Sequence, residues 1–164
     1  MGKSIEDLKE AFAGESQANR KYLAFAEKAD REGYPQVARL FRAAAEAETI
    51  HALNHLRALR AVGATAENLK EAISGETHEF TKMYPGMIAD AQAEGNKEAE
   101  RTFNFANEVE KVHAQLFQKA LETMGEKNLV EMFVCSVCGY TVAGEAPEVC
   151  PVCKALKKMF RRVE

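Results

Sequence analysis

Two Glu-x-x-His sequences restrict what this 164-residue chain can fold into more than any other feature. The first runs from Glu48 to His51 in an alanine-rich, helix-forming stretch, and the second runs from Glu110 to His113. Residues three apart in an α-helix share one face, so each pair presents a carboxylate beside an imidazole. Two such pairs on two helices are typical of di-iron or di-manganese four-helix bundles, in which each of the other two helices supplies a carboxylate.

Length and composition favour one domain, with room for a small appendage. The sequence is 46% hydrophobic and 29% charged, which is ordinary for a globular protein. Its net charge is −3 and its basic residues are scattered, so we expect no nucleic-acid partner. Because no apolar run is long enough to span a membrane and no secretory signal is visible, we expect a cytoplasmic protein without membrane contacts.

Capping residues and apolar periodicity predict four long helices and one short one. The first helix opens with a capping box at Ser4 and Asp7. A kink is expected at Pro85-Gly86, because proline lacks the N–H that a helix interior needs. The expected long helices are residues 4–31, 35–62, 75–94 and 97–124, with the short helix at 66–73 and a linker at 126–131.

An internal repeat relates the two halves of this helical region. Residues 14–51 align with residues 75–113, with one extra residue in the second copy. Each copy is predicted to be a helical hairpin with one lone glutamate, Glu15 or Glu76, and one Glu-x-x-His pair. Two such hairpins packed face to face give a pseudo-two-fold site of four carboxylates and two imidazoles. The second copy adds a fifth carboxylate, because Glu79 stands where the first copy has alanine.

The lone glutamates and those of the two pairs interrupt apolar stripes, which favours a metal site over ordinary solvent-facing glutamates. Unpaired buried carboxylates would protonate, whereas two divalent cations remove the cost of burying their charge. Oxygen-rich ligation with one imidazole per metal suits iron or manganese better than zinc. The predicted ligands are Glu15, Glu48, His51, Glu76, Glu79, Glu110 and His113.

The ligands are expected to play different roles. Glu48 and Glu110 are best placed to bridge the two metals, with Glu15 and Glu76 as terminal ligands. Glu79 is available to compete with His51 or to join it. Five carboxylates suit a higher metal charge better than a lower one, so we expect a redox-dependent exchange between Glu79 and His51.

Two tyrosines follow the glutamates on the same predicted helices. Tyr22 comes seven residues after Glu15, and Tyr84 comes five residues after Glu79. Either hydroxyl could hydrogen-bond a ligand carboxylate or a bound oxygen species, and packing in the core is an equal alternative. The predicted catalytic residues are Glu79, His51, Tyr22 and Tyr84.

All four cysteines form two Cys-x-x-Cys pairs, which are Cys135 with Cys138 and Cys150 with Cys153. Such clustering indicates a metal site rather than a disulfide framework. Two knuckles of this kind hold one tetrahedral iron or zinc through four thiolates. A segment of about thirty residues cannot build a real core, so we expect the metal to hold it together.

Together these features resemble the rubrerythrin family over essentially the whole chain. The resemblance rests on the ligand motifs of all four helices, beginning at Gly14-Glu15-Ser16-Gln17-Ala18-Asn19, and on both cysteine knuckles. It implies a mainly α fold, with a ferritin-like di-iron four-helix bundle in residues 1–130 and a rubredoxin-like domain in residues 131–164. The family's metal ligands and its tyrosines near the site fall on the residues already named. One departure is Lys154, where a rubredoxin knuckle usually has glycine.

The resemblance implies a peroxidase of oxidative-stress defence that reduces hydrogen peroxide to water. Electrons would reach the two irons of each chain through the four-cysteine iron, from a redox partner such as rubredoxin or a reductase. The family's usual head-to-tail dimer leads us to expect at least a homodimer. Two alternatives stay open: a ferroxidase or iron-storage protein of the ferritin-like class, and a non-enzymatic adaptor with a zinc ribbon.

Overall fold

Helices account for most of the computed structural model, which describes residues 2–126 and 128–164. The chain divides into two compact units, Met1–Gly63 and Ala64–Glu164, and each contains one helical hairpin. A small three-stranded sheet with four cysteines follows the second hairpin, so the predicted mainly α fold class is confirmed. Lys127, in the predicted linker, lies outside the described residues. No helix of the described part is both long and apolar enough to cross a membrane.

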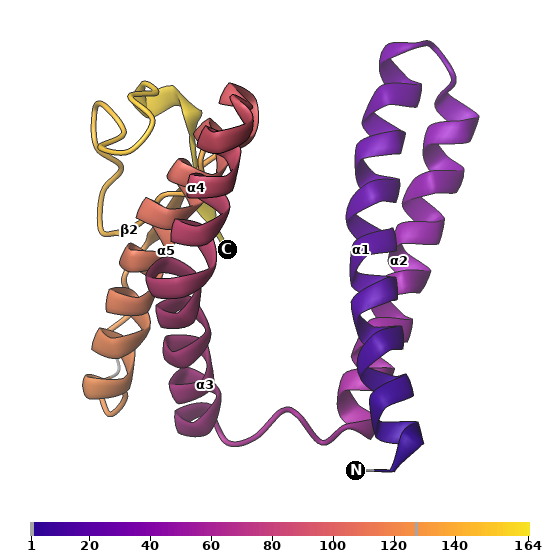
Figure 1. Cartoon of the computed structure of the whole chain (residues 1–164), viewed down its shortest axis with the longest axis horizontal. Helices are drawn as coiled ribbons and strands as arrows, with labels where there is room; N and C mark the ends of the chain where they lie inside the picture. The colour runs from indigo at the N-terminus through magenta and orange to yellow at the C-terminus, as the bar shows by residue number, and fades with distance from the viewer. Residues whose placement is uncertain (1, 127) are drawn as a thin grey trace. The chain divides into compact units, whose positions relative to one another are not determined.

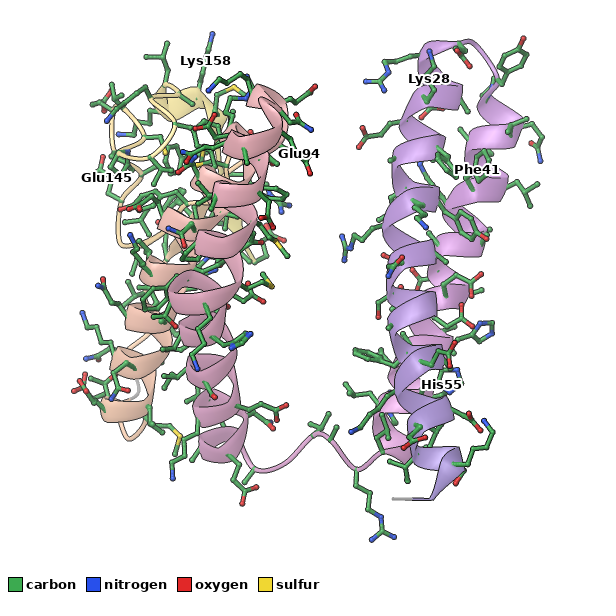
Figure 2. All side chains as sticks on the ribbon, viewed as in Figure 1. Lys28, Phe41, His55, Glu94, Glu145 and Lys158 are labelled. Carbon is green, nitrogen blue, oxygen red and sulfur yellow. The ribbon has the colours of Figure 1, made fainter. Side chains whose placement is uncertain are left out.

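The first unit consists of α1 (Lys3–Arg31) and α2 (Pro35–Ala58), which lie side by side as antiparallel helices (Figure 1). Gly33 makes the turn between them with a φ of +82°, a conformation that glycine adopts without a steric penalty. Small side chains let the two backbones approach closely. Figure 2 labels Phe41 on α2, whose ring packs against a buried cluster of Ala26, Ala29 and Ala38.

Two helix ends in this unit differ from the prediction. The capping box at Ser4 does not form, because α1 already begins at Lys3 and Asp7 instead pairs with the Lys3 ammonium at 2.8 Å. Helix α2 ends at Ala58 rather than near residue 62. Arg60 adopts a left-handed φ of +53°, and the Ala61 N–H donates to the carbonyl of Leu56 at 3.2 Å, which closes the helix.

The second unit begins with one long helix in three segments: α3 (Thr65–His78), the π-helical segment η1 (Glu79–Met83) and α4 (Tyr84–Glu94). The predicted break between residues 73 and 75 was wrong, since the helix continues through Ser74. The irregularity lies at η1, where the Tyr84 N–H donates to the carbonyl of Glu79, five residues back. Helix α5 (Lys97–Glu122) packs antiparallel beside this helix after a turn at Gly95 (Figure 1).

The π-helical segment accounts for the extra residue of the second repeat. The three segments hold 14, 5 and 11 residues, one more in total than the 29 residues of α1. A π turn accommodates one residue more than an α turn. The flanking α-helical segments therefore keep the face that they present in the first repeat.

The chain ends in a small antiparallel sheet with strand order β2-β1-β3. Its strands are β1 (Met132–Cys135), β2 (Thr141–Ala143) and β3 (Phe160–Val163), and a 3-10 turn, η2 (Lys157–Met159), precedes the last one. Strand β2 contacts α5, which places the sheet against the second hairpin. Figure 2 labels Glu145 and Lys158, two exposed side chains of this segment.

Candidate metal sites

The first hairpin brings together three of the predicted ligands. Glu15 projects from α1, and Glu48 and His51 project from α2, with one ligand atom of each within 4.8 Å of the others. The Nδ1 atom of His51 lies 2.8 Å from Glu48 Oε2 and 4.0 Å from Glu15 Oε1. The imidazole therefore directs Nδ1, and not Nε2, toward the carboxylates.

The second hairpin repeats this arrangement almost atom for atom. Glu76 of α3 and Glu110 and His113 of α5 form a second group within 4.8 Å. His113 Nδ1 lies 2.7 Å from Glu110 Oε2 and 3.8 Å from Glu76 Oε1. Two hairpins of different sequence thus bring the same three residue types together at nearly the same distances.

The chemistry of each half-site fits one divalent cation. Two carboxylates and one imidazole are the donors that iron and manganese accept, and their spacing lets several of them reach one ion. Burial, followed by the negative charge of Glu110, raises the pKa of Glu76, although the nearby His113 opposes the shift. Without a metal, the surroundings of Glu76 therefore disfavour its negative charge. A bound cation would offset this charge.

Metal-free protein is expected to lose stability as the pH rises from the ordinary Glu pKa of 4.5 through the raised pKa of Glu76. In that window the folded state binds more protons than the unfolded state, so the free energy of unfolding falls as pH increases. The Glu76→Gln variant should lose this dependence and melt at a higher temperature than wild type at neutral pH. Thermal unfolding of both proteins without metal, from about pH 4 to about pH 8, measures the difference. The exposed Glu71→Gln variant is the control, and identical pH profiles for Glu76→Gln and wild type would contradict the assignment.

Glu79 begins the π-helical segment η1, and Tyr84 directly follows it. Glu79 is half-buried one turn after Glu76, outside the group of three ligand atoms within 4.8 Å. Burial, then the charges of Glu79, Glu110 and Glu76, raise the pKa of Tyr84, so its hydroxyl lies in the field of the half-site. Residues five apart would diverge on an α-helix, whereas a π turn brings them closer to one face.

Tyr22 has different surroundings. Its ring centroid lies 6.3 Å from that of Phe25 and 6.1 Å from that of Phe41, and the latter packs against the buried alanine cluster. These contacts favour the packing alternative for Tyr22. A catalytic role for this residue stays a prediction.

The four cysteines converge on one point from the two knuckles. The Sγ atoms of Cys135 and Cys153 are 3.6 Å apart, and so are those of Cys138 and Cys150. Sulfur atoms around a tetrahedral metal at about 2.3 Å are separated by nearly the same distance, so the residues fit one such ion. Burial raises the pKa of Cys138 and Cys153. Burial acts in the same direction on Cys135, but hydrogen bonds from the backbone N–H groups of Val137 and Cys138, together with those from neighbouring thiols, lower the pKa of Cys135 overall.

The residue that directly follows each knuckle has a left-handed backbone conformation, but it is a glycine after the first knuckle and a lysine after the second. Gly139, after the first knuckle, has a φ of +85°, and Lys154, after the second, has a φ of +63°. The left-handed conformation costs a non-glycine residue about 1–2 kcal/mol. The Lys154 ammonium donates to the carbonyl of Pro151 at 2.8 Å, an exposed contact that offsets little of this cost.

The Lys154→Gly variant is expected to raise the free energy of unfolding of the metal-loaded cysteine segment by about 0.5–1 kcal/mol. Relief of the left-handed strain is partly cancelled by the greater freedom of glycine in the unfolded chain. Denaturant titration followed by the loss of metal–thiolate absorption measures the change. The control is Lys158→Gly, which lies in the ordinary backbone of η2 and should lower the free energy of unfolding. If Lys154→Gly lowers this free energy as much as Lys158→Gly does, the expectation is contradicted.

Sequence reasoning missed two polar residues beside the half-sites. Asn19 donates from Nδ2 to the carbonyl of Ala45 at 2.7 Å and to Thr49 Oγ1 at 2.8 Å, which ties α1 to α2 next to Glu48. Its position one turn after Glu15 was the only available signal. Thr141 Oγ1 lies 2.9 Å from His113 Nε2, a contact between residues 28 positions apart that no motif indicates.

Known proteins match the chain along nearly its whole length. The family model described as Rubrerythrin matches residues 6–121, and the model described as Rubrerythrin, rubredoxin-like domain matches residues 133–161. Rubrerythrin-2 of Clostridium acetobutylicum is 40% identical, and the alignment covers 94% of this chain and 93% of that protein. Nigerythrin of Nitratidesulfovibrio vulgaris is 38% identical, with 98% and 86% covered.

Solved structures also align with the chain along nearly its whole length. The partially reduced state of nigerythrin aligns with a TM-score of 0.61 at 35% identity, covering 99% of this chain and 88% of that chain. Its fully reduced, all-ferrous state aligns with the same TM-score, identity and coverage. The matched residues include all eleven predicted metal ligands, since both family models together span them.

Proposed function

The chain belongs to the rubrerythrin family, and on this basis we propose that it is a non-haem di-iron peroxidase that reduces hydrogen peroxide to water. Family membership identifies a di-iron oxidoreductase of oxidative-stress defence. The proposal adds the substrate and an electron route through a four-cysteine iron. The observation that carries it is the pair of equivalent half-sites in a chain that also gathers four thiolates around one point.

In this proposal, residues 1–130 form the ferritin-like di-iron domain and residues 131–164 form the rubredoxin-like domain. The Glu15 group and the Glu76 group would each hold iron through two carboxylates and one imidazole. A third iron would be held by the four cysteine thiolates, with zinc as the other ion that such a site accepts. The support lies in the matching half-site distances and in the tetrahedral sulfur spacing.

A bound pair of reduced irons would supply the two electrons that break the O–O bond, and two protons complete the conversion of peroxide to two waters. The residues of the chain bind and orient the reactants. Burial and the charges of Glu79, Glu110 and Glu76 raise the pKa of Tyr84, and its hydroxyl can donate a hydrogen bond to a peroxide oxygen. Glu79, whose charge acts on Tyr84, is the carboxylate we assign to hold and return a proton.

The two imidazoles are anchored differently, which supports a movable role for His51. The His113 side chain is 26% exposed and both its ring nitrogens have partners. The His51 side chain is 53% exposed, and within the described part of the chain its Nε2 atom has no hydrogen-bond partner. We assign His51 as the movable ligand, and crystals of oxidised and reduced protein with identical ligation would contradict this role.

The electron donor is proposed to be another redox protein, such as a rubredoxin or a reductase. A homodimer is proposed as the smallest active form. Within the first hairpin, Leu40 is 68% exposed and Ile50 is 53% exposed, so this hairpin leaves apolar side chains for a further layer of helices to cover.

Peroxide turnover separates the proposal from its alternatives. Iron-loaded protein supplied with a rubredoxin, its reductase and reduced nicotinamide should consume one nicotinamide for each hydrogen peroxide. A storage protein would instead form mineral cores when excess Fe(II) and oxygen are supplied. An adaptor with zinc on its four thiolates would not absorb visible light at this site and would consume no peroxide. Mineral cores without peroxide turnover would overturn the proposal in favour of storage.

A further inference from the structure

His113 is hydrogen-bonded at both ring nitrogens, and the partner at the far end comes from the cysteine segment. Nδ1 faces Glu110 at 2.7 Å, while Nε2 faces Thr141 Oγ1 of β2 at 2.9 Å. His113 and Thr141 belong to the same compact unit of the chain. A direct polar contact therefore joins the cysteine segment to a half-site residue of its own chain.

The directions of these hydrogen bonds follow from the donors available. Thr141 Oγ1 also lies 3.0 Å from the carbonyl oxygen of Gly139, which can only accept, so the single hydroxyl proton of Thr141 is directed there. Toward His113 the hydroxyl oxygen must then accept, and Nε2 must carry the proton. At Nδ1 the Glu110 carboxylate can only accept, so a metal ion bound there would take the place of this hydrogen bond while the Nε2–H bond to Thr141 stays unchanged.

The hydroxyl of Thr141 is held in place by the first cysteine knuckle. Gly139 follows Cys138 directly, and its N–H donates to the carbonyl of Cys135 at 2.9 Å. Its φ of +85° suits glycine, and a Cβ there would lie 3.8 Å from Val109 Cγ1 on α5. Val109, only 2% exposed, precedes Glu110, so the knuckle packs on the turn of α5 that carries the second half-site.

We propose that Thr141 is a positioning residue, whose hydroxyl oxygen accepts from Nε2–H and so fixes the ring orientation of His113 with Nδ1 directed at the half-site. The inference rests on the proposed function, because it assigns His113 a metal. It adds that the cysteine segment completes the half-site of its own chain. The first hairpin has no equivalent, since Nε2 of His51 lacks a partner among the described residues. Carboxylate or hydroxyl partners of this kind typically change metal affinity by about 10- to 100-fold.

Imidazole NMR of the full-length protein tests the proposal without an activity assay. Uniformly ¹⁵N-labelled wild type, Thr141→Val and Thr141→Ser are compared metal-free and loaded with zinc alone. In wild type, the Nε2–H of His113 should exchange more slowly than that of His51, both metal-free and with zinc bound. Thr141→Val should accelerate this exchange and the release of zinc from the second half-site by about tenfold, and Thr141→Ser should restore both. The His51 signals should stay unchanged in all three proteins.

Backbone amide spectra show whether Phe133 and Val134 of β1 keep their environment in Thr141→Val, so that loss of the sheet is recognised separately. If the valine variant disturbs the sheet, zinc-loaded wild type and the serine variant still decide the question. Exchange and zinc release that are the same in wild type and Thr141→Val would overturn the proposal, and so would zinc bound through Nε2 of His113 in wild type. Failure of wild type to bind zinc at His113 would instead overturn the proposed function, because the metal-free exchange data test Thr141 independently.

Discussion

The Glu110→Gln variant is expected to lose about 10³-fold in peroxide turnover while it stays folded. A metal contributes several kcal/mol of transition-state stabilisation, and this carboxylate is proposed to hold an iron together with Glu76 and His113. Glu110 lies 2.7 Å from His113 Nδ1, and its charge raises the pKa of Glu76. The variant should therefore bind fewer irons in the bundle, and its metal-free form should melt at a higher temperature than metal-free wild type. Iron analysis, calorimetry and turnover of the same preparations measure these effects.

The matched control is Glu108→Gln. Glu108 lies on the same helix, is largely exposed and pairs with Lys111 at 2.6 Å, so its substitution removes the same charge away from the half-site. It should retain wild-type iron content and turnover. A Glu110→Gln variant with full iron content and turnover would show that the second group is not a metal site.

The Cys138→Ser variant is expected to lose turnover driven by the redox partner while the reduced bundle still reacts once with peroxide. Four thiolates are proposed to hold the metal that keeps Met132–Val163 folded, and structural sites of this kind contribute about 10–16 kcal/mol in zinc-finger peptides. Loss of one thiolate should therefore remove the ion and loosen the sheet. Visible absorption reports the metal, and stopped-flow oxidation of chemically reduced protein reports the bundle. Thr141 belongs to this sheet, so zinc release from the second half-site should also be faster.

Ser136→Ala is the control for the knuckle. Its hydroxyl is exposed and donates to the carbonyl of Met159 at 2.8 Å, and Ser136 is not one of the four residues grouped for the metal, so colour and turnover should be kept. Sustained turnover by Cys138→Ser with the redox partner would contradict the proposed electron route.

The sequence predicted the half-sites well because their signal is local. The three-residue spacing of Glu48 with His51 needs only an α-helix, and the repeat added Glu15 and Glu76 as the residues opposite. The Cys-x-x-Cys knuckles are equally local. For these groups the structure brings together the residues that the motifs singled out, six in the half-sites and four in the cysteine cluster.

Features that depend on non-local contacts or on backbone strain were less predictable. Ser74 suggested a helix start, but the hydrogen bonds of α3 continue through it, and the extra residue is absorbed further on, at η1. Arg60 ends α2 in a left-handed conformation that side-chain type alone disfavours. Thr141 reaches His113 only because a sheet packs on α5, and no spacing rule connects residues that lie 28 positions apart.

The most direct test of the central claim is the metal content and visible spectrum of anaerobically reduced protein before and after one equivalent of hydrogen peroxide. We expect about three irons per chain, two in the Glu/His half-sites and one on the cysteines. Ferric–thiolate absorption should return rapidly after peroxide is added, since electrons leave the four-cysteine iron for the oxidised pair. Zinc in the cysteine site, or a spectrum that peroxide leaves unchanged, would contradict the peroxidase account and leave only the fold.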